Sequence, residues 1–221
     1  MNVRTSALLA IAALAAAVPA QTNPLLVAQG VVPAQQNYLL APTSVTIQGS
    51  GFLASPALQI EFGGVPATQV LVINDTTLTC VPPSRGPGVV EVSLDNGLQQ
   101  TVIQRGFAYT PAVDHTGFAA PGNVATLSFH QPAGSQMLAA WGVGPRASLA
   151  FPPLVGTVEI NPNYTLCFAP YWLTDRFDLT LPVPPNPALT GVTFLVQSLA
   201  GTNLFWNAQG TFSNCYELVI Q

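Results

Sequence analysis

The chain has 221 residues, of which 49% are hydrophobic and only 6% charged. Nine acidic residues outnumber five basic ones, all of them arginine, and the net charge is −4. Because a nucleic-acid binder needs clustered cations and these arginines are dispersed, the composition excludes nucleic acid as a partner.

Residues 1–20 have the pattern of a cleaved export signal. Arg4 precedes an apolar run from Ala7 to Val18, and Val18-Pro19-Ala20 supplies small residues for cleavage before Gln21. The run is shorter than the ~20 residues that span a bilayer, and no later stretch reaches that length. We therefore expect a secreted or cell-surface protein with no integral membrane segment after signal cleavage. Its sparse surface charge favours self-association.

The elements that follow are predicted to be short strands. Proline and glycine together supply 39 residues (21 plus 18), and no helical periodicity appears between them. Apolar and polar residues alternate at Val45–Ile47 and Leu58–Phe62, as in strands with one buried face. Further strands are expected near Val31 and at Val70–Ile73, Leu78–Val81, Val89–Leu94, Leu98–Ile103 and Phe107–Tyr109. This density of strands is typical of an immunoglobulin-like β-sandwich, so the fold class is all-β.

Two turns can be predicted in detail. Gly49-Ser50-Gly51-Phe52 predicts a bulged bend in which the glycines let the backbone turn and Phe52 is anchored in the core. It has neither the lysine nor the following helix of a P-loop. Asp95-Asn96-Gly97 predicts a three-residue hairpin loop with Gly97 left-handed, which would pair Leu94 with Leu98.

Four segments between Val31 and Pro111 carry a family pattern in their order and spacing. They are Thr46–Phe52, Ile60–Gly64 with Ala67, Leu78–Pro82 and Gly88–Val92. Together they resemble the IPT/TIG family, whose immunoglobulin-like domains occur in plexins, some transcription factors and many exported bacterial proteins. The resemblance implies a sandwich whose loops and strand edges bind partners without a catalytic residue.

The pattern typical of strands is interrupted around Thr110–His115, and we place a domain boundary there. This gives an IPT/TIG-like domain at 21–112 and a second, β-sandwich-like domain at 113–221. Strands are expected at Val124–Phe129, Gln136–Trp141, Ser148–Phe151, Val158–Ile160, Thr165–Phe168, Phe177–Leu181, Val192–Val196 and Cys215–Ile220.

The second half also carries a family pattern, in Leu179–Pro182, Pro187–Phe194, Gln197, Ser213-Asn214 and Leu218–Ile220. These residues are similar to a C-terminal β domain of exported planctomycete-type bacterial proteins. That resemblance implies a surface or sorting role by association only.

Three cysteines follow the signal: Cys80, Cys167 and Cys215. Export favours disulfides, and an odd number leaves one cysteine unpaired. We expect a Cys167–Cys215 disulfide, because both residues lie in apolar, strand-like runs of the second half, and a buried free thiol at Cys80. The alternative is three buried thiols.

Few side chains suit catalysis or metal binding. His115 is expected in a hydrated turn and His130 at a strand end exposed to water, and no nucleophile motif accompanies them. Asp175 and Asp178 flank Arg176 as on a solvated strand face, which is a poor calcium site. We expect no catalytic residue, no metal ion and no cofactor.

Two aromatic segments are the candidate ligand-binding residues. Tyr171-Trp172 and Phe205-Trp206-Asn207 fall in predicted loops, where indoles can stack on sugar rings and an amide can bond hydroxyl groups. The alternative is that these aromatics cap the core beneath long loops.

The expected function is that of a non-enzymatic exported bacterial surface or extracellular protein that binds, adheres or scaffolds. Its partner would be an extracellular protein or a polysaccharide. One alternative is a carbohydrate-binding accessory module or a secreted hydrolase component, which paired carboxylates ~5–9.5 Å apart in a cleft would support. A further alternative is a self-assembling structural protein whose open strand edges pair.

Overall fold

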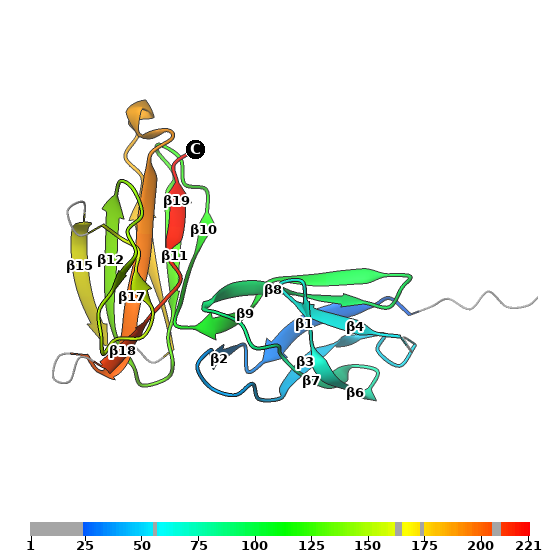
Figure 1. Ribbon diagram of the computed structural model, residues 1–221. Helices are drawn as coiled ribbons and strands as arrows, with labels where there is room; N and C mark the ends of the chain where they lie inside the picture. Colours follow the sequence, from blue (N-terminus) through cyan, green and yellow to red (C-terminus); the bar gives the residue numbers. More distant parts are fainter. Residues whose placement is uncertain (1–23, 55–56, 162–164, 173–174, 205–208) are drawn as a thin grey trace, which may run out of the picture.

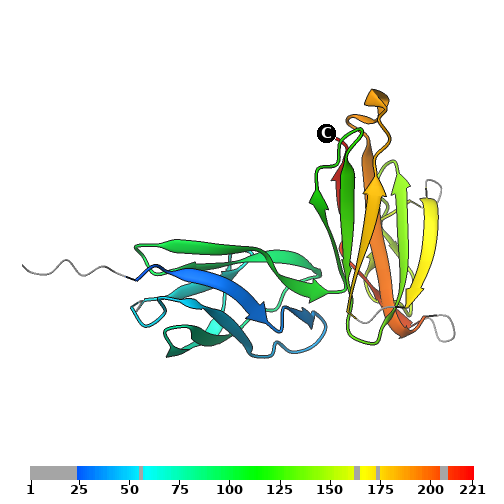
Figure 2. The same cartoon turned by 180° about the vertical axis from the view of Figure 1, so that it is seen from behind.

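The computed structural model describes residues 24–54, 57–161, 165–172, 175–204 and 209–221. The expected signal peptide, 1–20, lies outside these residues. The described elements are β-strands and one 3-10 turn, so the all-β expectation is confirmed. None of them is a helix that is both long and apolar enough to cross a membrane. The strands build two sandwiches that meet in an L-shaped molecule (Figures 1 and 2).

The N-terminal sandwich packs a four-stranded sheet on a five-stranded one. The first has the order β1-β3-β7-β6, with β1 at Val27–Val32, β3 at Val45–Ser50, β7 at Thr77–Val81 and β6 at Thr68–Asn74. The second has the order β2-β9-β8-β4-β5, at Gln35–Asn37, Gln100–Thr110, Gly88–Asp95, Gln59–Phe62 and Val65–Pro66. The core between them includes Ile47, Leu78 and a row of rings in which Phe107 contacts Phe62 and Tyr109 edge-on.

The C-terminal sandwich begins one residue after the N-terminal one ends. One sheet has the order β10-β11-β16, at Ala112–Gly117, Val124–His130 and Arg176–Pro182. The other contains β15 at Thr165–Trp172, β12 at Gln136–Val143, β17 at Thr193–Asn203, β18 at Gln209–Phe212 and β19 at Tyr216–Val219. A small pair, β13 at Leu149–Ala150 and β14 at Thr157–Val158, and the 3-10 turn Pro187–Leu189 complete it. Leu127, Phe129 and Met137 are buried between the sheets.

The interruption of the strand pattern expected around Thr110–His115 is not a long linker, because β9 continues almost directly into β10. Pro111 alone separates β9 from β10, and the Thr110–Pro111 peptide bond is cis. His115, expected in a hydrated turn, lies within β10 opposite Leu127, and its ring contacts Tyr216. The apolar alternation that marks a strand is weak here because His115 and Gly117 occupy the inward positions that follow Val113.

The glycine bend is confirmed. Gly51 has a φ of +80°, and Phe52 is 1% exposed. The Asp75 carboxylate accepts hydrogen bonds from the backbone N–H groups of Gly51 (3.3 Å) and Leu53 (3.2 Å), which fixes the bend from outside. Gly49 is needed for close approach, because a Cβ there would lie 2.0 Å from the carbonyl oxygen of Val27 on β1.

The predicted register of the β8–β9 hairpin is wrong. Leu94 pairs with Thr101 and Asp95 with Gln100, so the loop has four residues, 96–99. The Asn96 side chain explains the longer loop, since its Oδ1 accepts hydrogen bonds from the backbone N–H groups of Leu98 (3.0 Å) and Gln99 (2.7 Å). Gly97 has a φ of +82°, as expected.

The expected Cys167–Cys215 disulfide is not formed, because Cys215 is a free, buried cysteine. The strand order gives the reason: β15, which carries Cys167, is separated from β19 by β12 and β17. Three strand spacings of about 4.8 Å place the two backbones much farther apart than the ~7 Å limit for a disulfide. Cys80 is free and buried, as expected.

Polar residues of the second family pattern form buried hydrogen bonds. Gln197 is 3% exposed and donates to the carbonyl oxygens of Thr157 (2.8 Å) and Ser213 (3.1 Å). The Asn214 side chain exchanges two hydrogen bonds with the backbone of Val113. These side chains therefore fix the long final segment against β17 and β10.

Candidate functional site

An irregularity in β9 places Arg105. The β8–β9 ladder shifts register between Val90 and Val92, so the residues between Ile103 and Phe107 leave the regular pairing. Within this stretch Arg105 has a left-handed backbone with a φ of 54°. A bulge re-aims a side chain away from the strand's alternation. The guanidinium group of Arg105 accordingly reaches the next sandwich and forms an ion pair with Asp114 on β10.

The surface that Arg105 meets is the outer face of the β10-β11-β16 sheet. Leu127 and Phe129 of β11 point into the core, so Ser128 and His130 lie on the opposite face. Ser128 is nevertheless fully buried. This polar face is therefore covered by other side chains.

The antiparallel register explains which side chains cover it. Ser128 lies between Asp114 on β10 and Asp178 on β16, while His130 lies directly beside Arg176. The guanidinium of Arg176 donates from Nε to Asp178 (2.9 Å) and from Nη2 to the Ser128 hydroxyl (3.3 Å). Two of the four arginines after the signal segment thus converge on one small area of this sheet.

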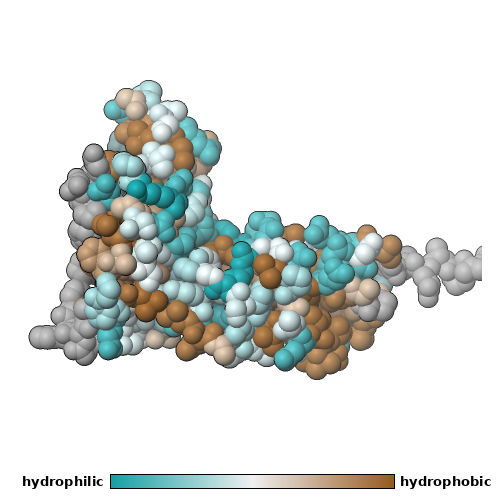
Figure 3. Space-filling view, viewed as in Figure 1, coloured by the Kyte–Doolittle hydropathy of each residue, from teal (hydrophilic) through white to brown (hydrophobic). Residues whose placement is uncertain are grey.

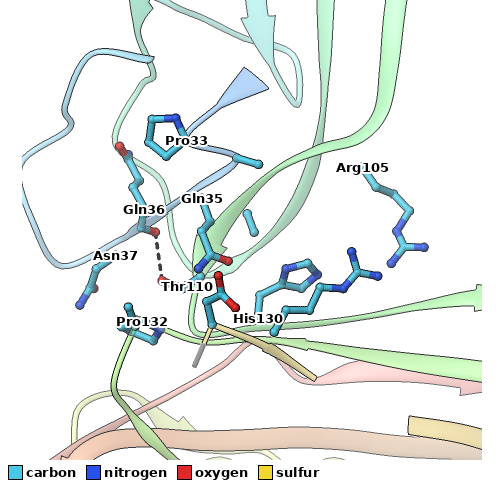
Figure 4. Close-up of a pocket in the computed structure, with 13 residues that line it drawn as sticks. Pro33, Gln35, Gln36, Asn37, Arg105, Thr110, His130 and Pro132 are labelled. Atoms are coloured by element: carbon cyan, nitrogen blue, oxygen red, sulfur yellow. Dashed lines mark hydrogen bonds between the residues drawn. The ribbon is translucent and has the colours of Figure 1, made fainter. Parts of the chain in front are cut away.

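A cavity of about 600 Å³, here called the junction pocket, opens where the two sandwiches meet. Figure 4 shows Gln36 and Asn37 on one side of it and His130 and Arg105 on the other. A hydrogen bond from the Thr110 hydroxyl to the Gln36 carbonyl oxygen (3.2 Å) fixes β2 against β9. The lining residues are Pro33, Ala34, Gln35, Gln36, Asn37, Arg105, Ala108 and Thr110 from the N-terminal sandwich, and His130, Pro132, Ala133, Asp175 and Arg176 from the C-terminal one.

A second cavity of about 240 Å³ adjoins the same side chains. Arg105, His130 and Arg176 line it together with Val89 and Gln104. Arg105, His130 and Arg176 therefore line both cavities. A hydrogen bond of 3.1 Å from Gln35 Nε2 to the carbonyl oxygen of Gln131 closes the contact between the sandwiches.

His130 is neutral at physiological pH. Burial, followed by the nearby positive charge of Arg176, lowers its pKa to about 4, against the weaker opposing influence of Asp114. Its Nε2 atom is buried and has no hydrogen-bond partner among the described residues. The expectation of a strand-end histidine exposed to water is wrong, because the N-terminal sandwich covers this end of β11.

The lining of the junction pocket combines hydrogen-bonding side chains with apolar ones. Its guanidinium groups donate, its amides donate and accept, and prolines and alanines supply the apolar surface. Among the described residues that line the pocket, one carries a carboxylate, Asp175, whereas glycoside hydrolysis by the usual mechanism uses two carboxylates. Within the described part of the chain no group of three or more His, Cys, Asp or Glu could hold a metal ion.

The structure describes the backbone of only one of the two aromatic segments. Tyr171 and Trp172, expected in a loop, end strand β15 and pair with Met137 and Gln136. Phe205, Trp206 and Asn207 lie outside the described residues. Gln136 pairs with Trp172 on one side and Gly201 on the other, so β15 ends beside the strand that leads to the second aromatic segment.

The comparisons with known proteins bear mainly on the N-terminal sandwich. Residues 28–109 match the IPT/TIG domain family. This match confirms the expected resemblance for that part of the chain, and it covers less than half of the 221 residues. A search of curated protein sequences found no match.

Solved structures that are similar to this chain include three different classes of protein. An auxiliary nutrient binding protein from Bacteroides ovatus is 24% identical with a TM-score of 0.30, over 43% of this chain and 23% of that one. A gamma-CGTase from alkalophilic Bacillus clarkii is 15% identical with a TM-score of 0.32, over 88% of this chain and 26% of that one. A cytokine receptor complex is 13% identical with a TM-score of 0.29, over 88% and 94%. The chain spans about a quarter of the first two proteins, and at these TM-scores none of the three carries an argument about function.

Proposed function

We propose that this chain is a non-enzymatic, exported bacterial surface or extracellular protein that binds or scaffolds, with a polysaccharide or a protein as its ligand. The IPT/TIG match at 28–109 and the all-β fold support a binding or scaffolding role. Export rests on the sequence pattern of residues 1–20. The division into domains at 21–112 and 113–221, with a surface role for the second, is part of the proposal.

The observation that carries the proposal is the junction pocket. Groups that donate and accept hydrogen bonds reach it from both sandwiches, so a ligand there contacts both sandwiches at once. Amide and guanidinium groups suit the hydroxyl and carbonyl groups of saccharides and extended peptides. The aromatic segments Tyr171-Trp172 and Phe205-Trp206-Asn207 remain a second set of proposed ligand-binding residues.

A glycan array probed with residues 21–221 tests the polysaccharide arm, and capture of extracellular proteins on the immobilised chain tests the protein arm. The variants Trp172→Ala and Trp206→Ala examine the aromatic segments, and Arg176→Gln examines the junction pocket. We expect retained ligands whose binding falls in at least one variant. Failure of the intact chain to retain any glycan or protein would contradict a binding role.

Self-assembly is a second candidate, because one sheet edge is apolar and exposed. On β6, the edge strand beside β7, Leu71 and Ile73 are 62% and 56% exposed. Figure 3 shows hydrophobic surface over β6. The pairing of β6 with β7 shifts register twice, however, and such bulges oppose continuous pairing with another strand.

Light scattering across a hundredfold range of concentration tests self-assembly. If β6 mediates association, the intact chain shows a rising mass and Leu71→Lys shows a constant one. A constant monomer mass for the intact chain would contradict assembly through this edge.

A further inference from the structure

Arg105 and Arg176 bring to the junction pocket hydrogen-bond donors that the described residues do not use. Arg105 uses its Nε atom on Asp114, and no partner of its two terminal nitrogens lies among the described residues. Arg176 uses Nε on Asp178 and Nη2 on Ser128, and its Nη1 likewise has no partner among the described residues. A ligand that bonds these nitrogens must therefore bring acceptors.

The geometry of the guanidinium groups favours a carboxylate as that acceptor, although their charges already face Asp114, Asp178 and Asp175. A guanidinium group presents paired donors in a planar fork that matches the two oxygens of a carboxylate. Arg105 is partly buried, with 30% of its side chain exposed, so its charge is screened less than that of a freely exposed arginine. His130 is uncharged, so it adds no third positive charge beside the two guanidinium groups.

The opposite side of the pocket favours a saccharide as the carrier of the carboxylate. Gln35, Gln36 and Asn37 line it, and each amide keeps one polar atom beyond its single side-chain hydrogen bond. Gln35 keeps an acceptor oxygen, while Gln36 and Asn37 keep donor nitrogens, so the three amides together can bond neighbouring hydroxyl groups. An acidic peptide would satisfy the arginines but would bring few hydroxyl groups to these amides.

We propose that the junction pocket binds a uronate unit of an acidic polysaccharide. The carboxylate would bond the terminal nitrogens of Arg105 and Arg176, and the ring hydroxyl groups would bond the amides of β2. This inference rests on the proposed binding function and names its ligand class. It assigns no role to the aromatic segments.

Calorimetric titration of residues 21–221 with trisaccharides of galacturonate, glucuronate and mannuronate tests the proposal at neutral pH and low salt. Each uronate is paired with its carboxyl-reduced counterpart, which keeps the ring and loses the charge. Because hydrogen bonds to charged groups contribute more than neutral ones, we expect at least one uronate to bind at least about tenfold more tightly than its reduced form. The proposal would be overturned if every uronate bound as tightly as its reduced form, or if no uronate bound at all.

Two arginine variants locate the site. Arg176→Gln, at an exposed ion pair, should weaken uronate binding at least about tenfold without disturbing the core. Arg146→Gln is the matched control, because Arg146 forms comparable ion pairs with Glu159 and Glu217 within the C-terminal sandwich. Equal affinity of intact chain and Arg176→Gln, or an equal loss in both variants, would overturn the assignment to the junction pocket.

Polyglutamate separates an acidic saccharide from an acidic peptide. We expect it to bind more weakly than the best uronate, and binding of equal strength would overturn the saccharide assignment. The glycan array keeps the two proposals distinguishable. If neutral glycans or proteins are retained while every uronate fails, the binding function stands and the uronate inference falls.

Discussion

At the scale of single residues, the N-terminal sandwich depends on glycines that lie against a neighbouring backbone. Gly49→Ala would place its Cβ 2.0 Å from the Val27 carbonyl oxygen and 2.6 Å from the Phe52 ring. Because β1 must shift to relieve this overlap, we expect the free energy of unfolding to fall by about 1–3 kcal/mol or more. Urea denaturation measures it. Gly30→Ala on β1 is the control, since nothing lies within 4 Å of a Cβ there, and equal losses in both variants would contradict this account.

His130 should make stability depend on pH. Its folded-state pKa of about 4 lies below the 6.5 of an exposed imidazole. Between these values the unfolded chain binds the additional proton, so stability is highest above pH ~6.5 and is lost as the pH falls toward ~4. We expect His130→Gln to reduce the difference in unfolding free energy between pH 7 and pH 4.5 by about 2 kcal/mol. Urea denaturation at both pH values checks this, and an unchanged difference would contradict it.

At the scale of elements, the existence of most strands could be predicted and their register could not. Alternation over Leu58–Phe62 and Phe177–Leu181 reports which face is buried, and both segments are strands. The 96–99 loop and the bulge at Arg105 depend on local hydrogen bonds and a left-handed residue, which leave no periodic signal. The disulfide prediction failed for a related reason, because an apolar strand does not reveal its place in the sheet.

The four-residue β8–β9 loop can be tested through Asn96. Its Oδ1 accepts two backbone hydrogen bonds, and Gln99 in the same loop accepts another from Leu26 N (2.7 Å). We expect Asn96→Ala to lower the unfolding free energy by about 1–2 kcal/mol, because two turn N–H groups lose their partner. Leu98→Ala is the control, since Leu98 is 78% exposed at the same tip. Thermal and urea denaturation should show a lower stability for Asn96→Ala than for Leu98→Ala. Identical stabilities of the two variants would show that the Asn96 contacts are not required.

At the scale of the whole molecule, the fold was predictable and the junction pocket was not. Its residues come from β2, β9, β11, the start of β16 and the loops next to these strands, and only the contact between the sandwiches brings them together. The alternation of β11 does show Ser128 and His130 facing away from the core. No local pattern shows that Arg105 reaches this face, because it does so from an irregular stretch of another sandwich.

The contact between the sandwiches should depend on Asp114. Its side chain is 15% exposed and pairs with Arg105, so Asp114→Ala leaves a partly buried guanidinium without its carboxylate. We expect the unfolding free energy to fall by about 1–3 kcal/mol and the two sandwiches to reorient more independently. NMR relaxation measures this as a common rotational correlation time in the intact chain and two different times in the variant. Glu217→Ala, which removes a carboxylate from Arg146 within one sandwich, should keep the common value. Independent tumbling in the intact chain, or an unchanged common value in Asp114→Ala, would show that this ion pair does not hold the junction.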